Sequence, residues 1–185
     1  MNVELLQYTP EPEKTVALAA RLCYSPVSIG RLQEKLESTD IEAFLDKIMS
    51  LGHQSVLEHV SFTFGLEGIS RVTTHQLVRH RIASFSQQSQ RYVSHKEEYT
   101  SIMPDSIAEN EEARQIFAFM SETVHKAYAQ LVDMGIPAED ARYILPNAAE
   151  TKIIMTMNAR ELLHFFNLRC CRRAQWEIRE MGIEM

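Results

Sequence analysis

Only three segments of this chain have the residue pattern of a β-strand, and helical segments of unequal length separate them. The first covers residues 2–9 and the third residues 152–157. Between them, Val60 to Leu66 alternates large apolar side chains with smaller or polar ones, which is the period of a half-buried strand. A few strands with irregularly spaced helices do not follow the strand–helix repeat of α/β proteins. The pattern therefore predicts the α+β class.

Helical spacing and capping residues predict the segments between these strands. Asp40, Ser70 and Asn158 are suitable N-caps, and Gly52 and Gly135 are suitable helix ends. The predicted helices cover residues 11–24, 40–52, 70–81, 105–134 and 137–142, and a last helix follows Asn158. The polar, Gln- and Ser-rich segment 82–94 is predicted to be an ordered loop. No repeat and no Gly- or Pro-rich linker divides the chain, so we expect a single domain over residues 1–185.

The cysteines and the hydropathy indicate a reducing, aqueous environment. Three cysteines, of which Cys170 and Cys171 are neighbours, make a poor disulfide framework and match no common zinc-binding spacing. We therefore expect a cytoplasmic protein without a metal site. No apolar run approaches the length of a membrane span, and no signal peptide is visible, so no membrane association is expected.

The charge of the chain is unevenly distributed. The net charge is −6, which argues against a general nucleic-acid binder. Residues 68–96 nevertheless contain no Asp or Glu and carry several Arg, Lys and His residues, and residues 162–176 repeat this pattern. Two cationic segments in an acidic chain predict a focused site for a small polyanion.

The first cationic segment contains the sequence Arg79-His80-Arg81, followed after seven residues by Ser89. Guanidinium groups at a helix end suit anionic or carbonyl targets, because each can form bidentate charged hydrogen bonds. A hydroxyl at Ser89 and a guanidinium at Arg91 suit a phosphate group. The alternative is that these cations only complement the dipole of a helix C-terminus in water.

The second cationic segment lies on the predicted last helix. Arg169, Arg172 and Arg173 would occupy positions i, i+3 and i+4, where like charges repel each other by about 0.2–0.5 kcal/mol per pair. A bound anion would explain this arrangement, and so would distant acidic residues or a subunit interface. Arg160 and His164, four residues apart, would form a polar patch on the same helix.

These motifs together resemble those of the flavin-dependent thymidylate synthases. Arg79-His80-Arg81-x7-Ser89 is similar to the signature of that family, and Gly52-His53-x4-Glu58-His59 resembles its early FAD and folate segment. The resemblance continues in order through Ala141-Arg142-x2-Leu145-Pro146, Asn158-Ala159-Arg160-Glu161-Leu162, Phe166-Asn167-Leu168-Arg169 and Ala174-Gln175-Trp176-Glu177.

The resemblance implies specific site residues. Arg169 corresponds to the catalytic arginine, which would polarise the uracil ring, and His53 and Glu58 lie in the folate and nicotinamide region. The implied FAD contacts are Ser55, Arg79, His80, Arg81, Gln87, Asn158, Arg160 and His164. The implied nucleotide contacts are Gln76, Arg79, Gln87, Ser89, Arg91, Arg142 and Arg169. Gln87, His164 and Ser55 differ from the residues common in the family.

The resemblance also implies the fold, the reaction and the assembly. The expected fold is a mixed or antiparallel sheet flanked by long helices, in a homotetramer whose active sites are shared between subunits. The expected reaction converts dUMP to dTMP, with 5,10-methylenetetrahydrofolate as carbon donor and NADPH as reductant through FAD. Relatives continue further after the position of Trp176, so we expect the C-terminal helix to be short or truncated here.

The sequence is also compatible with three other functions. The arginines together with Phe85 and Tyr92 suit a single-stranded nucleic-acid module. Ser89 with a histidine suits a serine hydrolase, although Gly-x-Ser-x-Gly is absent. A flavoprotein that has lost synthase activity is the third.

Overall fold

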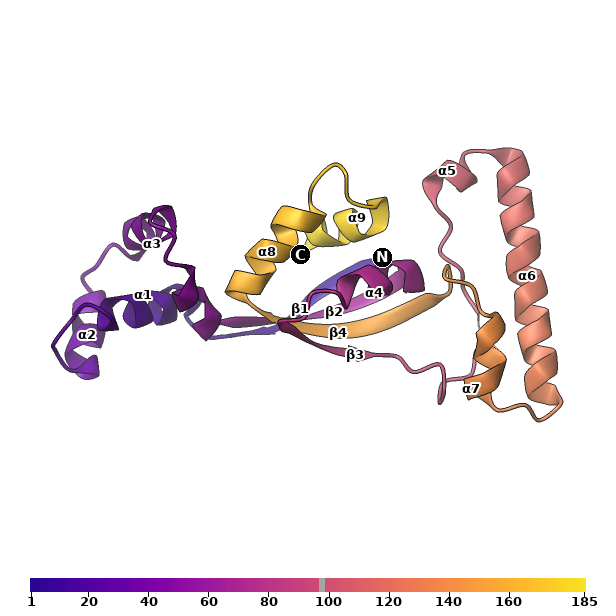
Figure 1. The fold of residues 1–185 in the computed structure, drawn as a ribbon, viewed down its shortest axis with the longest axis horizontal. Helices are drawn as coiled ribbons and strands as arrows, with labels where there is room; N and C mark the ends of the chain where they lie inside the picture. The colour runs from indigo at the N-terminus through magenta and orange to yellow at the C-terminus, as the bar shows by residue number, and fades with distance from the viewer. Residues whose placement is uncertain (97–98) are drawn as a thin grey trace. The chain divides into compact units, whose positions relative to one another are not determined.

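The structure, a computed structural model, describes residues 1–96 and 99–185. Within these residues, four strands form an antiparallel sheet with the order β1-β2-β4-β3 (Figure 1). The strands are β1 (Asn2–Tyr8), β2 (Ser61–Ser70), β3 (Ala83–Gln87) and β4 (Glu150–Asn158). Together with the helices, this sheet confirms the α+β class.

The helices are unequal in length, as the sequence predicts. They are α1 (Pro12–Leu22), α2 (Ile29–Leu36), α3 (Ile41–Ser50), η1 (Gln54–His59), α4 (Arg71–Leu77), α5 (Asp105–Ala108), α6 (Glu111–Asp133), α7 (Ala138–Ala141), η2 (Arg142–Ile144), α8 (Ala159–Arg169) and α9 (Trp176–Glu184). Across the described ranges, none of these helices combines the length and the apolar content that a bilayer crossing requires.

The chain divides into two compact units. The first unit comprises residues 1–2, 66–79 and 86–154, and the second comprises residues 3–65, 80–85 and 155–185. Strands β2 and β4 each contribute residues to both units. The expectation of one domain over residues 1–185 stays a prediction.

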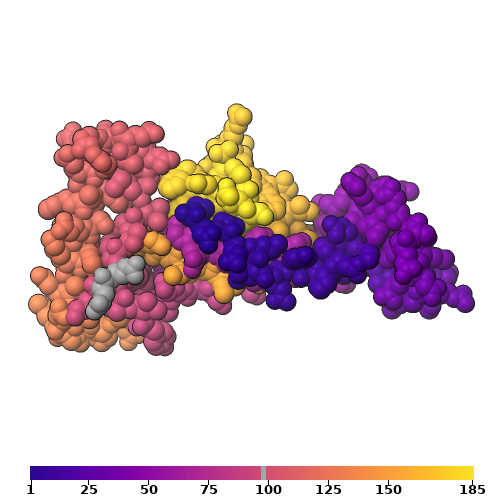
Figure 2. All heavy atoms as spheres, turned by 180° about the vertical axis from the view of Figure 1, so that it is seen from behind, coloured from indigo at the N-terminus to yellow at the C-terminus, as the bar shows by residue number. Residues whose placement is uncertain are grey.

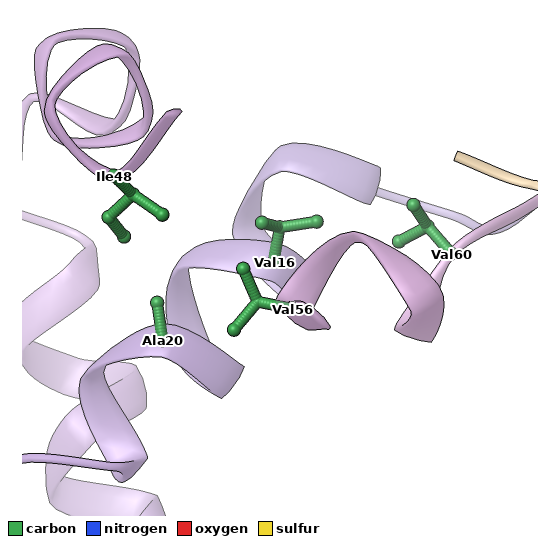
Figure 3. Packing of buried hydrophobic residues seen from close by; sticks show 5 residues of the cluster. All are labelled: Val16, Ala20, Ile48, Val56 and Val60. Carbon is green, nitrogen blue, oxygen red and sulfur yellow. The ribbon is translucent and has the colours of Figure 1, made fainter. Parts of the chain in front are cut away.

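In the second unit, an apolar cluster holds the N-terminal helices together. Val16 and Ala20 of α1, Ile48 of α3 and Val56 of η1 are buried with Val60 in one apolar cluster (Figure 3). Val16 and Ala20 are four residues apart, so they lie on the same face of α1. The C-terminal part of the unit packs α8 against α9 around buried Phe165, Ile178 and Met181.

In the first unit, the long helix α6 packs only part of its surface. Tyr128 is fully buried, whereas Ile116, Phe119 and Met120 are more than half exposed. Much of the length of α6 is at the surface in Figure 2, in the salmon part of the colour bar. A continuous apolar stripe on an exposed helix face is typical of an interface.

Several predicted boundaries are confirmed by their caps. Each cap side chain accepts the backbone N–H of the residue three positions later. Asp40 accepts from Ala43 in α3, Ser70 from Thr73 in α4, and Asn158 from Glu161 in α8. Gly52 and Gly135 have φ angles of 76° and 84°. This left-handed conformation favours glycine, so both residues end their helices as the sequence predicts.

Four predicted segments are wrong. The helix predicted for residues 70–81 ends at Leu77. Residues 83–87 of the predicted loop form β3, because they pair with β4 at the edge of the sheet. The hydrogen bonds of a strand come from its partner strand, which is distant in sequence. A polar segment such as this one therefore gives no local signal for a strand.

The other two corrections concern helices that were expected to be continuous. The helix predicted for residues 105–134 is divided, because the side chain of Asn110 accepts the backbone N–H of Ala113 and starts α6. The helix after Asn158 ends at Arg169, and a second helix, α9, begins after Gln175, whose side chain caps it. Arg172 and Arg173 therefore lie outside the helix of Arg169. The prediction that the three arginines occupy positions i, i+3 and i+4 of one helix is wrong.

Candidate functional site

The residues expected to bind the nucleotide, except Arg169, belong to the first unit. Gln76 lies on α4 and Arg79 follows the end of that helix. The remaining four lie on β3, the segment after it and η2; they are Gln87, Ser89, Arg91 and Arg142. Gln87 Nε2 donates to Thr74 Oγ1 at 3.0 Å and to Thr151 Oγ1 at 3.4 Å. These contacts fix the orientation of the Gln87 amide.

Glu139 joins two of these arginines. Arg91 Nε lies 2.9 Å from Glu139 Oε2, and Arg142 Nε donates to the backbone carbonyl of Glu139 at 3.0 Å. The Oγ of Ser89 accepts the backbone N–H of Arg91 at 3.2 Å. The structure therefore connects Ser89, Arg91 and Arg142 through short contacts in the first unit.

Arg71 adds a further cation to this cluster. Its Nη2 donates to the Gln88 carbonyl at 2.9 Å, and its Nε is buried without a hydrogen-bond partner among the described residues. Burial lowers the pKa of Arg71, and the nearby Arg142 guanidinium lowers it further. Two guanidinium groups that repel each other in a half-buried site favour a bound anion. The sequence places Arg71 in a cationic segment but predicts no role for it.

In the second unit, a cavity of about 420 Å³ brings together residues expected to bind FAD and folate. Asn158, Arg160 and His164 line it from the end of β4 and from α8, and Glu58 lines it from η1. Arg160 Nη1 forms an ion pair with Glu58 Oε1 at 2.5 Å, across 102 residues of sequence. The cavity therefore has both charged and hydrogen-bonding groups in its wall.

His53 and Ser55 line a different cavity of about 440 Å³ in the same unit. Its wall is largely apolar and includes Tyr24, Phe44 and Ile48. The ring of Tyr24 meets that of His53 edge to face at a centroid distance of 6.2 Å. The structure thus places Ser55 beside His53, and it places neither residue in the wall of the cavity that contains Arg160.

The Arg-His-Arg motif crosses the boundary between the units, because Arg79 belongs to the first and His80 and Arg81 to the second. Arg79 and Arg81 are exposed, whereas His80 is buried. His80 Nδ1 lies 3.0 Å from Glu161 Oε1, and Arg169 Nε donates to His80 Nε2 at 3.1 Å. The structure therefore joins two predicted site residues, His80 and Arg169, by a direct hydrogen bond.

The environment of His80 favours its neutral form. Burial lowers the pKa of His80 below its ordinary value, and the charges of Arg169 and His164 act in the same direction. The hydrogen bond to Glu161 opposes this shift without reversing it. Because Glu161 itself is buried, its contact with His80 also compensates the desolvation of a carboxylate.

Among the described residues, the three cysteines are free, and no group of three or more His, Cys, Asp and Glu side chains is arranged to hold a metal ion.

Comparison with known proteins places this site in a family. Residues 4–185 match the family described as thymidylate synthase complementing protein. The chain is 64% identical to the flavin-dependent thymidylate synthase of Geobacter sulfurreducens, over all of this chain and 80% of the relative. It is 50% identical to that of Clostridium tetani, with the same coverage, and 47% identical to that of Pyrococcus horikoshii, of which it covers 77%. The chain therefore belongs to the flavin-dependent thymidylate synthase family.

Proposed function

We propose that this chain converts dUMP to dTMP, with 5,10-methylenetetrahydrofolate as carbon donor and NADPH as reductant through FAD. Family membership over residues 4–185 supports the proposal. The observation that carries it is the hydrogen bond from Arg169 to the buried His80, because it holds a cation at a defined position. A fixed cation beside a uracil ring stabilises negative charge as it develops there.

FAD suits the polar residues that line the cavity of about 420 Å³ in the second unit. Arg160 and His164 provide donors for an anionic or carbonyl group, and Asn158 provides an amide at the wall of the same cavity. We assign FAD binding to these residues together with Ser55, Arg79, His80, Arg81 and Gln87. When bound, the flavin would supply the carbon-transfer and hydride chemistry that no side chain provides. We assign the folate and nicotinamide region to His53 and Glu58.

The nucleotide suits the first unit and Arg169. We assign the phosphate to Ser89, Arg91 and Arg142, because hydroxyl and guanidinium groups bind phosphate through short charged hydrogen bonds. Gln76, Arg79 and Gln87 complete the proposed nucleotide contacts. Ser89 then acts as a binding hydroxyl and not as the nucleophile of a hydrolase.

The assembly and the location are further proposals. We propose a homotetramer whose active sites are shared between subunits, which the exposed apolar face of α6 supports. We also propose that residues 1–185 form one synthase domain, that the enzyme works in the cytoplasm, and that it binds no nucleic acid.

Arg169→Ala tests the proposed function. The wild-type protein should show a bound-flavin spectrum that dUMP perturbs, and it should form dTMP in the presence of the folate and NADPH. Arg169→Ala should keep the flavin and lose dTMP formation, because the cation beside the uracil is gone. Arg173→Ala, at an exposed arginine after α8, is the control and should retain turnover. Turnover in Arg169→Ala, or a wild-type protein that takes up neither FAD nor dUMP, would contradict the proposal.

A further inference from the structure

A buried glutamate connects to the proposed catalytic arginine through His80. Glu161, in the first turn of α8, lies with its Oε1 3.0 Å from His80 Nδ1, and Arg169 Nε lies 3.1 Å from His80 Nε2. All three residues belong to the second unit. Glu161 lies 81 residues from His80 in sequence, and no local sequence pattern predicts a role for it.

The guanidinium determines which nitrogen of His80 carries the proton. Arginine has only N–H donors, so His80 Nε2 must be the acceptor in this contact. A neutral imidazole with a free electron pair on Nε2 carries its proton on Nδ1, and this N–H donates to the carboxylate of Glu161. The buried imidazole, whose pKa is lowered, is therefore present as the Nδ1–H tautomer at neutral pH.

We propose that Glu161 and His80 are positioning residues for Arg169: Glu161 selects the Nδ1–H tautomer of His80, and Nε2 of that tautomer holds the guanidinium. The inference rests on the role proposed above for Arg169. Without the carboxylate, His80 is free to carry its proton on Nε2. That N–H would then oppose the N–H of Arg169, and the hydrogen bond by which His80 orients the guanidinium would be lost.

The same geometry makes the position of Arg169 sensitive to acid. Protonation of His80 turns Nε2 into a donor and places a second positive charge beside Arg169. The charged and titratable groups that face His80 are Glu161, Arg169 and His164. The carboxylate of Glu161 raises the pKa of His80 against the effect of burial, so its removal should lower that pKa further.

Neutron diffraction from deuterium-exchanged crystals of the full-length protein tests the tautomer without any assay of activity. A deuteron on His80 Nδ1 and none on Nε2 is expected near neutral pH. A deuteron on Nε2 alone overturns the inference, because Nε2 could then accept no hydrogen bond from Arg169.

Kinetics of Glu161 variants test the consequence for the reaction. Glu161→Ala should lower kcat for dTMP formation by about 10- to 100-fold, the usual effect of a displaced catalytic group, with little change in KM for dUMP or in bound flavin. Glu161→Gln keeps an oxygen acceptor for Nδ1–H and should restore most of kcat. The acid limb of the pH profile of kcat should lie at lower pH in Glu161→Gln than in the wild type. A purely structural role of Glu161 would not cause this shift. Glu180→Gln, which makes the same charge change at an exposed position of α9, should leave kcat and the pH profile unchanged.

The outcomes separate this inference from the proposed function. If Glu161→Ala has the kcat of the wild type, the inference is refuted and the proposed synthase activity stands. The same holds if the acid limb of the pH profile of Glu161→Gln does not move. A wild-type protein that forms no dTMP refutes the proposed function instead. If Glu161→Ala fails to fold, as its thermal melt would show, the pH profile of Glu161→Gln decides the question.

Discussion

At the scale of single residues, the backbone N–H of Arg91 donates a hydrogen bond to Ser89 Oγ. This bond orients the hydroxyl beside a guanidinium that already contacts Glu139. Such a local turn presents a hydroxyl, a backbone segment and a cation within three residues. The arrangement suits binding of a phosphate better than nucleophilic attack, because no base orients the hydroxyl among these contacts.

Ser89→Ala should therefore weaken dUMP binding more than it slows the reaction. A hydrogen bond to a charged group contributes about 1.5–3 kcal/mol, so the dissociation constant measured by calorimetry should rise about tenfold or more. Ser94→Ala is a matched control, because Ser94 Oγ accepts the backbone N–H of Lys96 at the same distance of 3.2 Å. Loss of turnover with normal dUMP affinity would assign Ser89 to the chemical step instead.

The burial of His80 makes the stability of the fold depend on pH. Its pKa is lower in the folded protein than in the unfolded chain, so the unfolded chain binds the proton first as the pH falls. The contribution of His80 to the free energy of unfolding is therefore complete above about pH 6.5 and is lost as the pH falls toward the folded-state pKa.

Urea unfolding between pH 8 and pH 5 measures this effect. The free energy of unfolding should fall more steeply below pH 6.5 in the wild type than in His80→Asn, which lacks the titrating group. His75→Asn, at an exposed position of α4, should follow the wild type. Parallel curves for wild type and His80→Asn would mean that His80 titrates alike in the folded and unfolded chains.

At the scale of the elements, short polar side chains decide where the helices begin. Asp40 Oδ1 accepts the N–H of Ala43 at 3.1 Å and starts α3, which supplies Ile48 to the apolar cluster of the second unit. Asp40→Ala should lower the free energy of unfolding by about 1 kcal/mol, because a backbone N–H loses its partner. Asp40→Ser retains a hydrogen-bond acceptor and should change the free energy of unfolding by only a few tenths of a kcal/mol. Equal urea midpoints for the wild type and Asp40→Ala would contradict the cap.

The same local chemistry explains which helices the sequence predicts well. Asp40 and Ser70 precede clear apolar periods, so α3 and α4 begin where expected. Asn110 is an equally effective cap, but it lies within a longer helical period, so the break between α5 and α6 was not predicted. The edge strand β3 has a polar sequence, and only its pairing with β4 makes it a strand.

At the scale of the whole molecule, the exposed apolar residues of α6 favour an assembly. Ile116, Phe119 and Met120 have exposed fractions of 61%, 66% and 51%. Phe119→Glu should shift the assembly to smaller species in size-exclusion chromatography with light scattering, because a carboxylate would be desolvated in an apolar interface. Activity should fall in parallel if active sites are shared. Phe119→Leu is the control, and an unchanged mass for Phe119→Glu would exclude α6 from the interface.

The sequence by itself determined the class of fold, the main helix starts and the family motifs. These features depend on residues that are close together in the chain, such as a cap with the N–H three residues later. It also indicated the residue types for an anion site, because acid-free segments are visible without a structure.

The tertiary structure alone decided which of these residues meet. The contacts of His80 with Glu161 and Arg169 span 81 and 89 residues, and the ion pair of Arg160 with Glu58 spans 102. No local pattern encodes such contacts, because they depend on how strands and helices pack. Packing also buries His80, and its burial sets the protonation state that the motif Arg-His-Arg leaves open.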